Sequence, residues 1–362
     1  MNILFLASSL RTAGNLHPVF DAMRDRGDRV TLAWVPLGAA VEEDPSVLGF
    51  ADIIATRDGE RLESASTPFW ARLQARMRDD TFSLVVMDDM IHWPARRLSE
   101  AVADDVRDYP RPALVASQHG LHQAWNLMNQ RFLADYFLCY GHRHVLNFDQ
   151  RHWTRVLPTG LPKLDHLRPC AEGGGRYILF VAQSAPSPAV IAPVLSDLQR
   201  LTGLPVRIRP HPGHRAAYAG LSEEFGFLSP DEPIDGQIAL SEWMLTTHSS
   251  AVLEAMRMGK PVVLLPSFGL VDFGFFPGIA VDFRADKVLT ALKVHRTDAP
   301  GRQRFLAAHC GGTRSDAGVR TLATLDAIVR GDDAPQLVAS MGSEHPLNFG
   351  FAGQARSFTG PE

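Results

Sequence analysis

The sequence has no long hydrophobic run, few cysteines and no marked excess of either charge. No stretch approaches the roughly 18 apolar residues that a membrane-spanning helix needs, so we expect no such helix. The first residues carry no basic segment, and Ser8 and Ser9 interrupt their apolar run, which predicts a first β-strand rather than a signal peptide. These absences predict a cytoplasmic protein and leave peripheral contact with a membrane open.

The scarcity of cysteine and the balance of charge exclude further classes. Cys139, Cys170 and Cys310 are scattered, which argues against a disulfide framework and a zinc site. The formal net charge is -4 with both signs interspersed, so we expect no nucleic-acid partner. The 362 residues are too many for a typical single core and suit two domains.

Short apolar runs alternate with amphipathic segments, which predicts an α/β protein with parallel sheets covered on both faces. In the first half the expected strands are 3–8, 30–35, 53–55, 84–87, 114–117, 137–140 and 156–157, and the expected helices 16–26, 71–78 and 98–107. In the second half the expected strands are 177–181, 206–208, 225–228, 243–245, 262–265 and 279–281, and the expected helices 287–293, 302–309 and 317–330.

Linker-like residues near position 170 divide this pattern into two doubly wound halves. We therefore expect Rossmann-like domains over 1–168 and 172–330, with a cleft between them. The tail, 331–362, is expected to be loosely ordered or to pack on the other domain. Ligands of such sheets bind at the carboxyl ends of the strands, so the candidate residues are sought there.

The segment 11–18 follows the first strand and contains Gly14, Asn15, His17 and Pro18. A glycine there lets the backbone approach a ligand, and the following helix offers unpaired N–H groups. The segment lacks the G-x-G-x-x-G fingerprint, which weakens a dinucleotide interpretation. Gly14, Asn15 and His17 are candidates for an acceptor-side or diphosphate-binding loop. The alternative is an ordinary turn with Pro18 in the first helical turn.

His119 stands in the sequence Gln118-His119-Gly120 at the end of an apolar strand. A histidine at a strand end can project into the cleft and deprotonate a hydroxyl near neutral pH. The alternative is a structural histidine bound to a neighbouring carbonyl.

Arg209 and His211 follow another strand and are held by Pro210 and Pro212. Arginine suits phosphate oxygens, and a histidinium can stabilise charge on a leaving diphosphate. The alternative is a surface turn with incidental basic residues. Gln183 and Ser184, which follow the expected strand 177–181, are further donor-side candidates.

Ser249 and Ser250 open a helix between two strands. Serine is a good helix N-cap, and the same geometry can hold a diphosphate. Glu254 lies about one turn later and could accept hydrogen bonds from ribose hydroxyls. The alternative is a well-capped βαβ unit.

Metal and hydrolase motifs are missing. Asp88-Asp89 is not an Asp-x-Asp motif, and His142 and His144 lack acidic partners at ligand spacing, so no metal is expected. No Gly-x-Ser-x-Gly elbow occurs, which argues against an α/β-hydrolase.

With these motifs in order, residues 1–330 resemble the GT-B superfamily. Gly14-Asn15-x-x-Pro18 resembles nucleotide-sugar glycosyltransferases. Gln118-His119-Gly120, Arg209-Pro210-His211-Pro212 and Ser249-Ser250 resemble capsule-polysaccharide transferases and CDP-glycerol glycerophosphotransferases. The resemblance implies that His119 is a base and that His211 and the two serines hold the donor diphosphate.

The leading hypothesis is a metal-independent glycosyltransferase without a cofactor, acting from a nucleotide-activated donor on a surface polysaccharide, glycolipid or protein. The resemblance implies an acceptor-side first domain and a nucleotide-donor second domain. Polyol-phosphate transfer from a CDP-linked donor, a UDP-sugar 2-epimerase or hydrolase, and a non-catalytic nucleotide-binding module stay as alternatives. Leu121-His122-Gln123 replaces the Thr-x-x-Lys stretch of the glycerophosphotransferases, and Gln118-His119-Gly120 supplies no carboxylate of the epimerase type.

Overall fold

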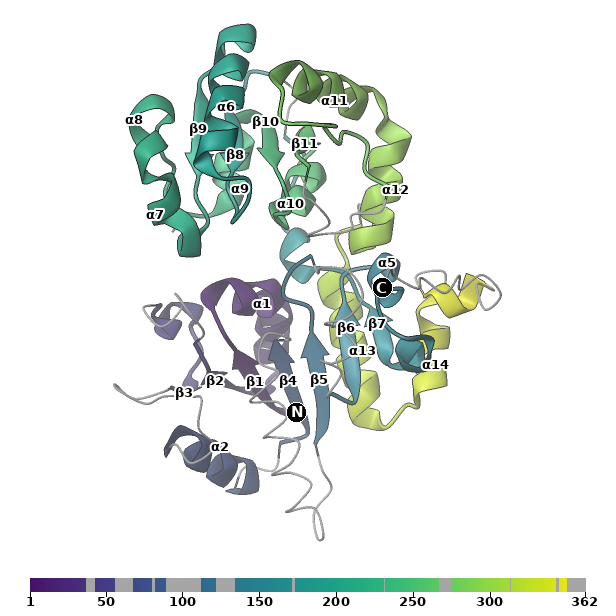
Figure 1. Cartoon of the computed structure of the whole chain (residues 1–362). Coiled ribbons are helices and arrows are strands. Elements are labelled where there is room, and N and C mark those ends of the chain that lie inside the picture. The colour runs from purple at the N-terminus through teal and green to yellow at the C-terminus, as the bar shows by residue number, and fades with distance from the viewer. Residues whose placement is uncertain are drawn as a thin grey trace, which may run out of the picture.

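The computed structural model consists of two parallel sheets flanked by helices (Figure 1). It describes residues 1–36, 43–55, 68–79, 82–88, 112–121, 134–170, 173–230, 232–266, 275–312, 314–342 and 345–349. Among these residues, no helix is long and apolar enough to cross a membrane.

The first sheet has seven parallel strands in the order β3-β2-β1-β4-β5-β6-β7. The strands are β1 Asn2–Ala7, β2 Arg29–Trp34, β3 Asp52–Ile54, β4 Leu84–Asp88, β5 Ala113–Ser117, β6 Tyr136–Cys139 and β7 Val156–Pro158. Each expected strand of the first half is present within one or two residues. Continuous apolar runs such as Ile3–Ala7 are fully buried because helices cover both faces.

The second sheet has four parallel strands in the order β11-β10-β8-β9. They are β8 Tyr177–Val181, β9 Val206–Arg209, β10 Ser241–Thr246 and β11 Val262–Leu264. The expected strands 225–228 and 279–281 are wrong, since these segments make only isolated bridges to Ile208 and Leu264. Val281 is 78% exposed and Phe225 ends a helix, so neither segment is a buried run.

The helices follow the strands in the expected alternation. They are α1 Leu10–Asp25, α2 Pro68–Asp79, α5 His142–Val145, α6 Pro188–Thr202, α7 Arg215–Tyr218, α8 Ser222–Phe225, α9 Ile234–Leu240, α10 Ala251–Arg257, α11 Ala285–Thr297, α12 Ala299–Cys310, α13 Ala317–Arg330 and α14 Ala334–Ser340. Short 3-10 turns are η2 Pro45–Leu48, η3 Gln150–Arg155, η4 Pro162–Leu164, η5 Pro212–His214, η6 Ala219–Leu221 and η8 Pro346–Phe349. The expected helix 98–107 lies outside the described residues.

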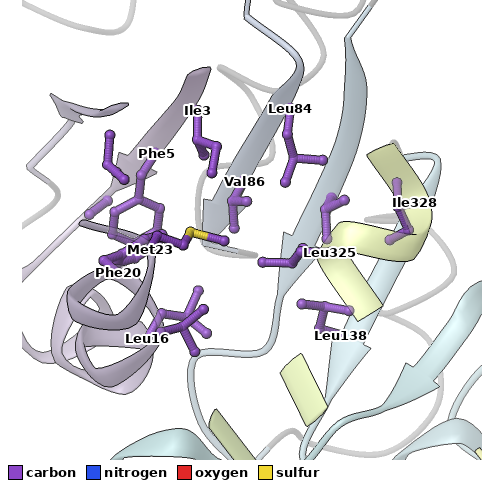
Figure 2. Close-up of a cluster of buried hydrophobic side chains, with 14 of the residues drawn as sticks. Ile3, Phe5, Leu16, Phe20, Met23, Leu84, Val86, Leu138, Leu325 and Ile328 are labelled. Carbon is purple, nitrogen blue, oxygen red and sulfur yellow. The ribbon is translucent and has the colours of Figure 1, made fainter. Parts of the chain in front are cut away.

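The chain returns to the first sheet after completing the second (Figure 1). Leu325 and Ile328 of α13 join the core formed by β1, β4 and α1, where they share a cluster with Phe20 (Figure 2). Leu337 of α14 joins the same cluster. The expected second domain ran to residue 330, whereas the apolar stripe of α13 is buried against the first sheet. His345 connects the segment after α14 to η3, because its Nε2 lies 2.9 Å from Trp153 O.

Side chains from both halves meet in a third core at the boundary. Leu161 and Leu164 of the connecting segment pack with Val252 of α10 and Phe305 of α12. The backbones of the two halves also touch at Gly141, where a Cβ would lie 2.4 Å from Ala308 O of α12. Only glycine fits there, so α12 rests directly on the chain that leaves β6.

Candidate functional site

The start of α1 differs from the expected loop. Ser9 and Thr12 form a capping box that starts the helix at Leu10, directly after β1. Gly14 and Asn15 therefore lie inside the second turn of α1, and Pro18 lies deeper in the helix rather than in its first turn. Of the segment 11–18, the exposed Arg11 stands nearest the helix start.

The turn that carries His119 is fixed by side-chain amides that donate hydrogen bonds to its backbone carbonyls. Asn15 Nδ2 donates to His119 O at 3.2 Å, and Gln118 Nε2 donates to Gly120 O at 2.7 Å. A Cβ on Gly120 would lie 3.6 Å from Arg11 Nη2, so Arg11 stands beside this turn. Asn15 is buried, and its contact brings the expected α1 motif and the His119 motif together.

His17 contacts its own helix and η2. Its Nδ1 lies 3.0 Å from Asp21 Oδ2 and its Nε2 lies 3.3 Å from Leu48 O. These contacts support the alternative of a histidine that serves the structure of α1 and η2.

Arg209 uses its guanidinium to hold a loop of its own half. Nη1 donates to Ser229 O, Glu232 O and Gln237 Oε1 at 2.7–3.0 Å, and Nη2 donates to Pro230 O at 2.7 Å. Both terminal nitrogens thus serve acceptors within 229–237. The expected contact between Arg209 and donor phosphates gains no support from this arrangement, because the guanidinium already has four acceptors.

His211 follows β9 and caps η5 with its own ring. Its Nδ1 accepts a hydrogen bond from Gly213 N at 3.1 Å, so the ring hydrogen resides on Nε2. The pKa of His211 is lowered to about 4, chiefly by burial and then by the charges of Arg11, His214 and His248. The ring is therefore neutral near pH 7, and the expected histidinium is replaced by a neutral Nε2–H donor.

The groups that lower the pKa of His211 come from both halves of the chain. Arg11 comes from α1 of the first half, whereas His214 lies in η5 and His248 in the turn after β10. The rings of His211 and His214 lie 5.3 Å apart. His214 and His248 were not predicted as site residues, although each lies within three residues of one that was.

His248 is oriented by Thr247. Thr247 Oγ1 donates its one hydrogen to Ala185 O at 2.9 Å and lies 2.8 Å from His248 Nδ1. The ring hydrogen therefore resides on Nδ1, and Nε2 carries a lone pair. Burial lowers the pKa of His248, and the charge of His214 lowers it further.

The serines lie at the start of α10 as expected. Ser249 Oγ accepts a hydrogen bond from Ala251 N at 3.2 Å, while Ser250 occupies the N-cap position without a side-chain cap bond. Both serines are half-buried.

Glu254 is buried within α10 and is only half-satisfied. Its Oε1 forms a 2.7 Å ion pair with Lys163 Nζ of η4, whereas Oε2 is buried and has no hydrogen-bond partner among the described residues. Buried carboxylate oxygens are normally hydrogen-bonded, so the lack of a partner for Oε2 among the described residues is unusual. Lys163 was not predicted as a site residue, because no motif in the sequence around it indicates an ion pair with the distant Glu254.

The donor-side candidates Gln183 and Ser184 lie in the turn after β8. Gln183 is half-buried and its carbonyl accepts from Tyr218 Oη at 3.1 Å, while Ser184 is exposed. The bond from Thr247 to Ala185 O ties this turn to His248. The turn after β8 and the serine turn thus lie side by side.

The described residues contain no cluster of three His, Cys, Asp or Glu side chains that could hold a metal ion. Asp88 is buried at the end of β4, where it accepts a hydrogen bond from Ser8 N at 3.0 Å. Asp89 lies outside the described residues.

No family model matches the chain, and no curated protein matches it in sequence. Solved structures match it over nearly their whole length. The UDP-GlcNAc 2-epimerase of Methanocaldococcus jannaschii, in complex with UDP-GlcNAc and UDP, is 10% identical with a TM-score of 0.60 over 90% of this chain and 99% of that one. A glycosyltransferase of Rickettsia africae is 13% identical with a TM-score of 0.57 over 92% and 99%. HepE of Anabaena, in complex with UDP and glucose, is 13% identical with a TM-score of 0.55 over 91% and 98%.

This likeness shows the fold. Two Rossmann-like parallel-sheet halves joined by a connector, matched over about nine-tenths of the chain, make this a GT-B fold. The expected fold class is confirmed, and the roles of the individual residues stay predictions.

Proposed function

We propose that this protein is a glycosyltransferase that moves a sugar from a nucleotide-activated donor to a hydroxyl group without a metal ion. The observation that carries the proposal is that Arg11 of one half lies close enough to His211 of the other to lower the pKa of that ring, as His214 and His248 also do. Positive charge and N–H donors that gather at strand ends suit the diphosphate of such a donor. The acceptor we propose is a surface polysaccharide, glycolipid or protein.

The donor is proposed to lie on the second half of the chain. The neutral Nε2–H of His211 would donate to a diphosphate oxygen, and Ser249 and Ser250 would add hydroxyl donors at the start of α10. Glu254 Oε2 would accept from the ribose hydroxyls, which supplies the partner that this buried oxygen lacks. Arg11 would add its charge from the first half. Arg209 would act indirectly by holding the loop over 229–237.

His119 is proposed as the base that activates the acceptor. It stands on the first half beside Arg11, close to the charges that would hold the donor. In the proposed step His119 takes the proton of the acceptor hydroxyl as that oxygen bonds to the anomeric carbon. The bond from this carbon to the diphosphate breaks, and the nucleoside diphosphate leaves with the electron pair. His211 and Arg11 would stabilise the charge that it carries.

A ligand panel tests the donor assignment. A ligand that binds only the folded state raises the melting temperature by mass action. We expect one or more of the UDP-, CMP-, CDP-, GDP- and dTDP-linked sugars to raise it, together with the matching free nucleotide. If none shifts the melting temperature at millimolar concentration, the proposal is wrong.

A second candidate is a nucleotide-sugar 2-epimerase or hydrolase, which is favoured because one of the solved structures is described as a 2-epimerase. Product analysis separates the two. Epimerised or hydrolysed donor without an acceptor would favour the second candidate, and transfer to added glycans or glycolipids would favour the first. Release of CMP from a CDP-linked polyol would instead indicate polyol-phosphate transfer, and binding without turnover a non-catalytic module.

A further inference from the structure

A buried polar chain runs from α12 in the second half of the sequence to the turn that carries His119. It passes through His309, His144 and Gln118, which are 3%, 4% and 1% exposed. We infer that His309 is a positioning residue for His119 and acts on it through His144 and Gln118. The inference rests on the proposed role of His119 as the base, and it adds a residue of the other half to that role.

The carboxamide of Gln118 fixes the direction of the chain. Its Oε1 accepts from Tyr140 N at 3.0 Å, and a backbone N–H can only donate. The amide nitrogen must therefore be Nε2 on the opposite side, where it lies 2.7 Å from Gly120 O and 3.2 Å from His144 Nδ1. Gln118 thus grips the residue after His119 and the ring of His144 with one group.

The orientation of Gln118 determines both histidine tautomers. Because Gln118 Nε2 donates, His144 Nδ1 must accept, and the ring hydrogen of His144 resides on Nε2. That Nε2 lies 3.3 Å from His309 Nδ1, so His309 also accepts at Nδ1. The order of donors is therefore the same from Gln118 through both rings, and no member can be turned round without breaking a bond.

Packing makes His309 a firm end of the chain. Its ring stacks on Phe305 with centroids 4.2 Å apart and planes inclined by 29°. The backbone of α12 rests on Gly141, where a Cβ would lie 2.7 Å from His309 C. A shift of α12 would therefore move His309 against His144. The same shift would reach the turn of His119 through Gln118 Nε2.

Asn15 holds the other side of the same turn. Its Nδ2 donates to His119 O and also to Tyr140 Oη at 3.0 Å. The carbonyl of His119 thus accepts a hydrogen bond from Asn15 of α1, and the carbonyl of Gly120 accepts one from Gln118. The hydrogen bond from Gln118 is connected to α12 through His144 and His309, so it relates the position of His119 to that of the second half.

Two variants of His309 test the inference. His309→Phe keeps a planar ring on Phe305 but removes the acceptor, whereas His309→Asn restores an acceptor near the position of Nδ1. A control is His345→Asn, which alters a buried histidine that is not part of the hydrogen-bonded series Gln118, His144 and His309. We expect His309→Phe to bind UDP, CDP or GDP within a few-fold of wild type and to turn over about 10- to 100-fold more slowly. His309→Asn should recover most of this loss, and His345→Asn should lower the melting temperature without changing turnover per folded molecule.

Wild-type turnover in folded His309→Phe would overturn the inference, as would a loss that only follows the unfolded fraction. A second measurement needs neither variant nor substrate. Ring ¹⁵N spectra of the wild-type protein should show Nδ1 of His144 and His309 without hydrogen at neutral pH, and an Nδ1–H form of either ring would also overturn it. Failure of every donor to bind would instead contradict the proposed function. The ring spectra would then still test whether Gln118, His144 and His309 are hydrogen-bonded in the stated order.

Discussion

Lys163 Nζ lies 2.7 Å from Glu254 Oε1 and joins the connector between the two halves to the helix that follows β10. The side chain of Glu254 is 8% exposed and that of Lys163 20%, so water screens the pair only in part. The second oxygen of Glu254 is left without a described partner. One carboxylate is thus held in place by the protein and still offers an acceptor.

This pair predicts a coupled effect on stability. Lys163→Met leaves Glu254 buried without its cation, which should lower the free energy of unfolding by about 1–3 kcal/mol. Lys163→Met combined with Glu254→Met should be less destabilised than the sum of the single variants, because neither charge is then left unpaired. Urea unfolding of the four proteins gives the coupling. Strict additivity would show that the pair contributes nothing.

The start of α10 should contribute to nucleotide affinity. Ser249→Ala combined with Ser250→Ala removes two hydroxyl groups, and each lost bond to a charged group costs on the order of 1.5–3 kcal/mol. We therefore expect at least a ten-fold weaker affinity for the nucleotide found in the panel, with the fold intact. Ser340→Ala is the control, because Ser340 lies in α14, outside the proposed donor site. Unchanged affinity in calorimetry would move the donor site elsewhere.

Histidine burial predicts a loss of stability in mild acid. His295 is 1% exposed and its pKa is lowered to about 3 from 6.5, mainly by burial. The unfolded chain therefore binds the proton more readily than the folded one. The contribution of the neutral His295 ring to the free energy of unfolding is thus complete above about pH 6.5 and is lost as the pH falls towards 3. Between pH 7.5 and pH 5 the loss is about 2 kcal/mol for this ring.

His295→Asn removes this titration. The free energy of unfolding of the variant should fall less between pH 7.5 and pH 5 than that of wild type, by that amount. Equal pH dependence of the two proteins would show that His295 is not held neutral in the fold. His166→Asn is the control, because His166 is exposed.

The sequence predicts those features that depend on neighbours along the chain. The run Tyr177–Val181 could only be a buried strand, and the serines before α10 mark its start correctly. The apolar face of α13 predicts that this helix is buried, but it does not predict against which element. In the structure α13 packs on the first sheet, whose strands come much earlier in the sequence. Arg209 illustrates the same limit, since its acceptors lie at least 20 residues away. His119 and Asn15 are 104 residues apart and meet only through the fold.

Activity should survive a chelator. In the proposed mechanism the charge of the leaving diphosphate is stabilised by His211, Arg11 and the start of α10, so no step needs a divalent ion. Turnover after dialysis against EDTA should equal that of the untreated protein. Abolition by EDTA, with recovery on adding magnesium or manganese, would contradict this part of the mechanism.

His119→Ala should affect chemistry more than donor binding. His119 stands on the first half of the chain, whereas His211, the serines and Glu254 lie on the second. The variant removes the imidazole and leaves the bond from Asn15 intact, because that bond is made to the backbone carbonyl. General-base catalysis contributes about 10²–10⁴-fold, so turnover should fall by that factor while nucleotide affinity stays within a few-fold.

The competing role for His119 is structural, and the same preparation decides between them. A structural histidine would lower the melting temperature of the variant and leave turnover per folded molecule nearly unchanged. His152→Ala is the matched control, because His152 lies in η3, where it contacts Arg151 and Arg155. It should change stability slightly and turnover little. If folded His119→Ala binds donor and turns over at the wild-type rate, His119 is not the base, and Asp89 and His17 become the next residues to test.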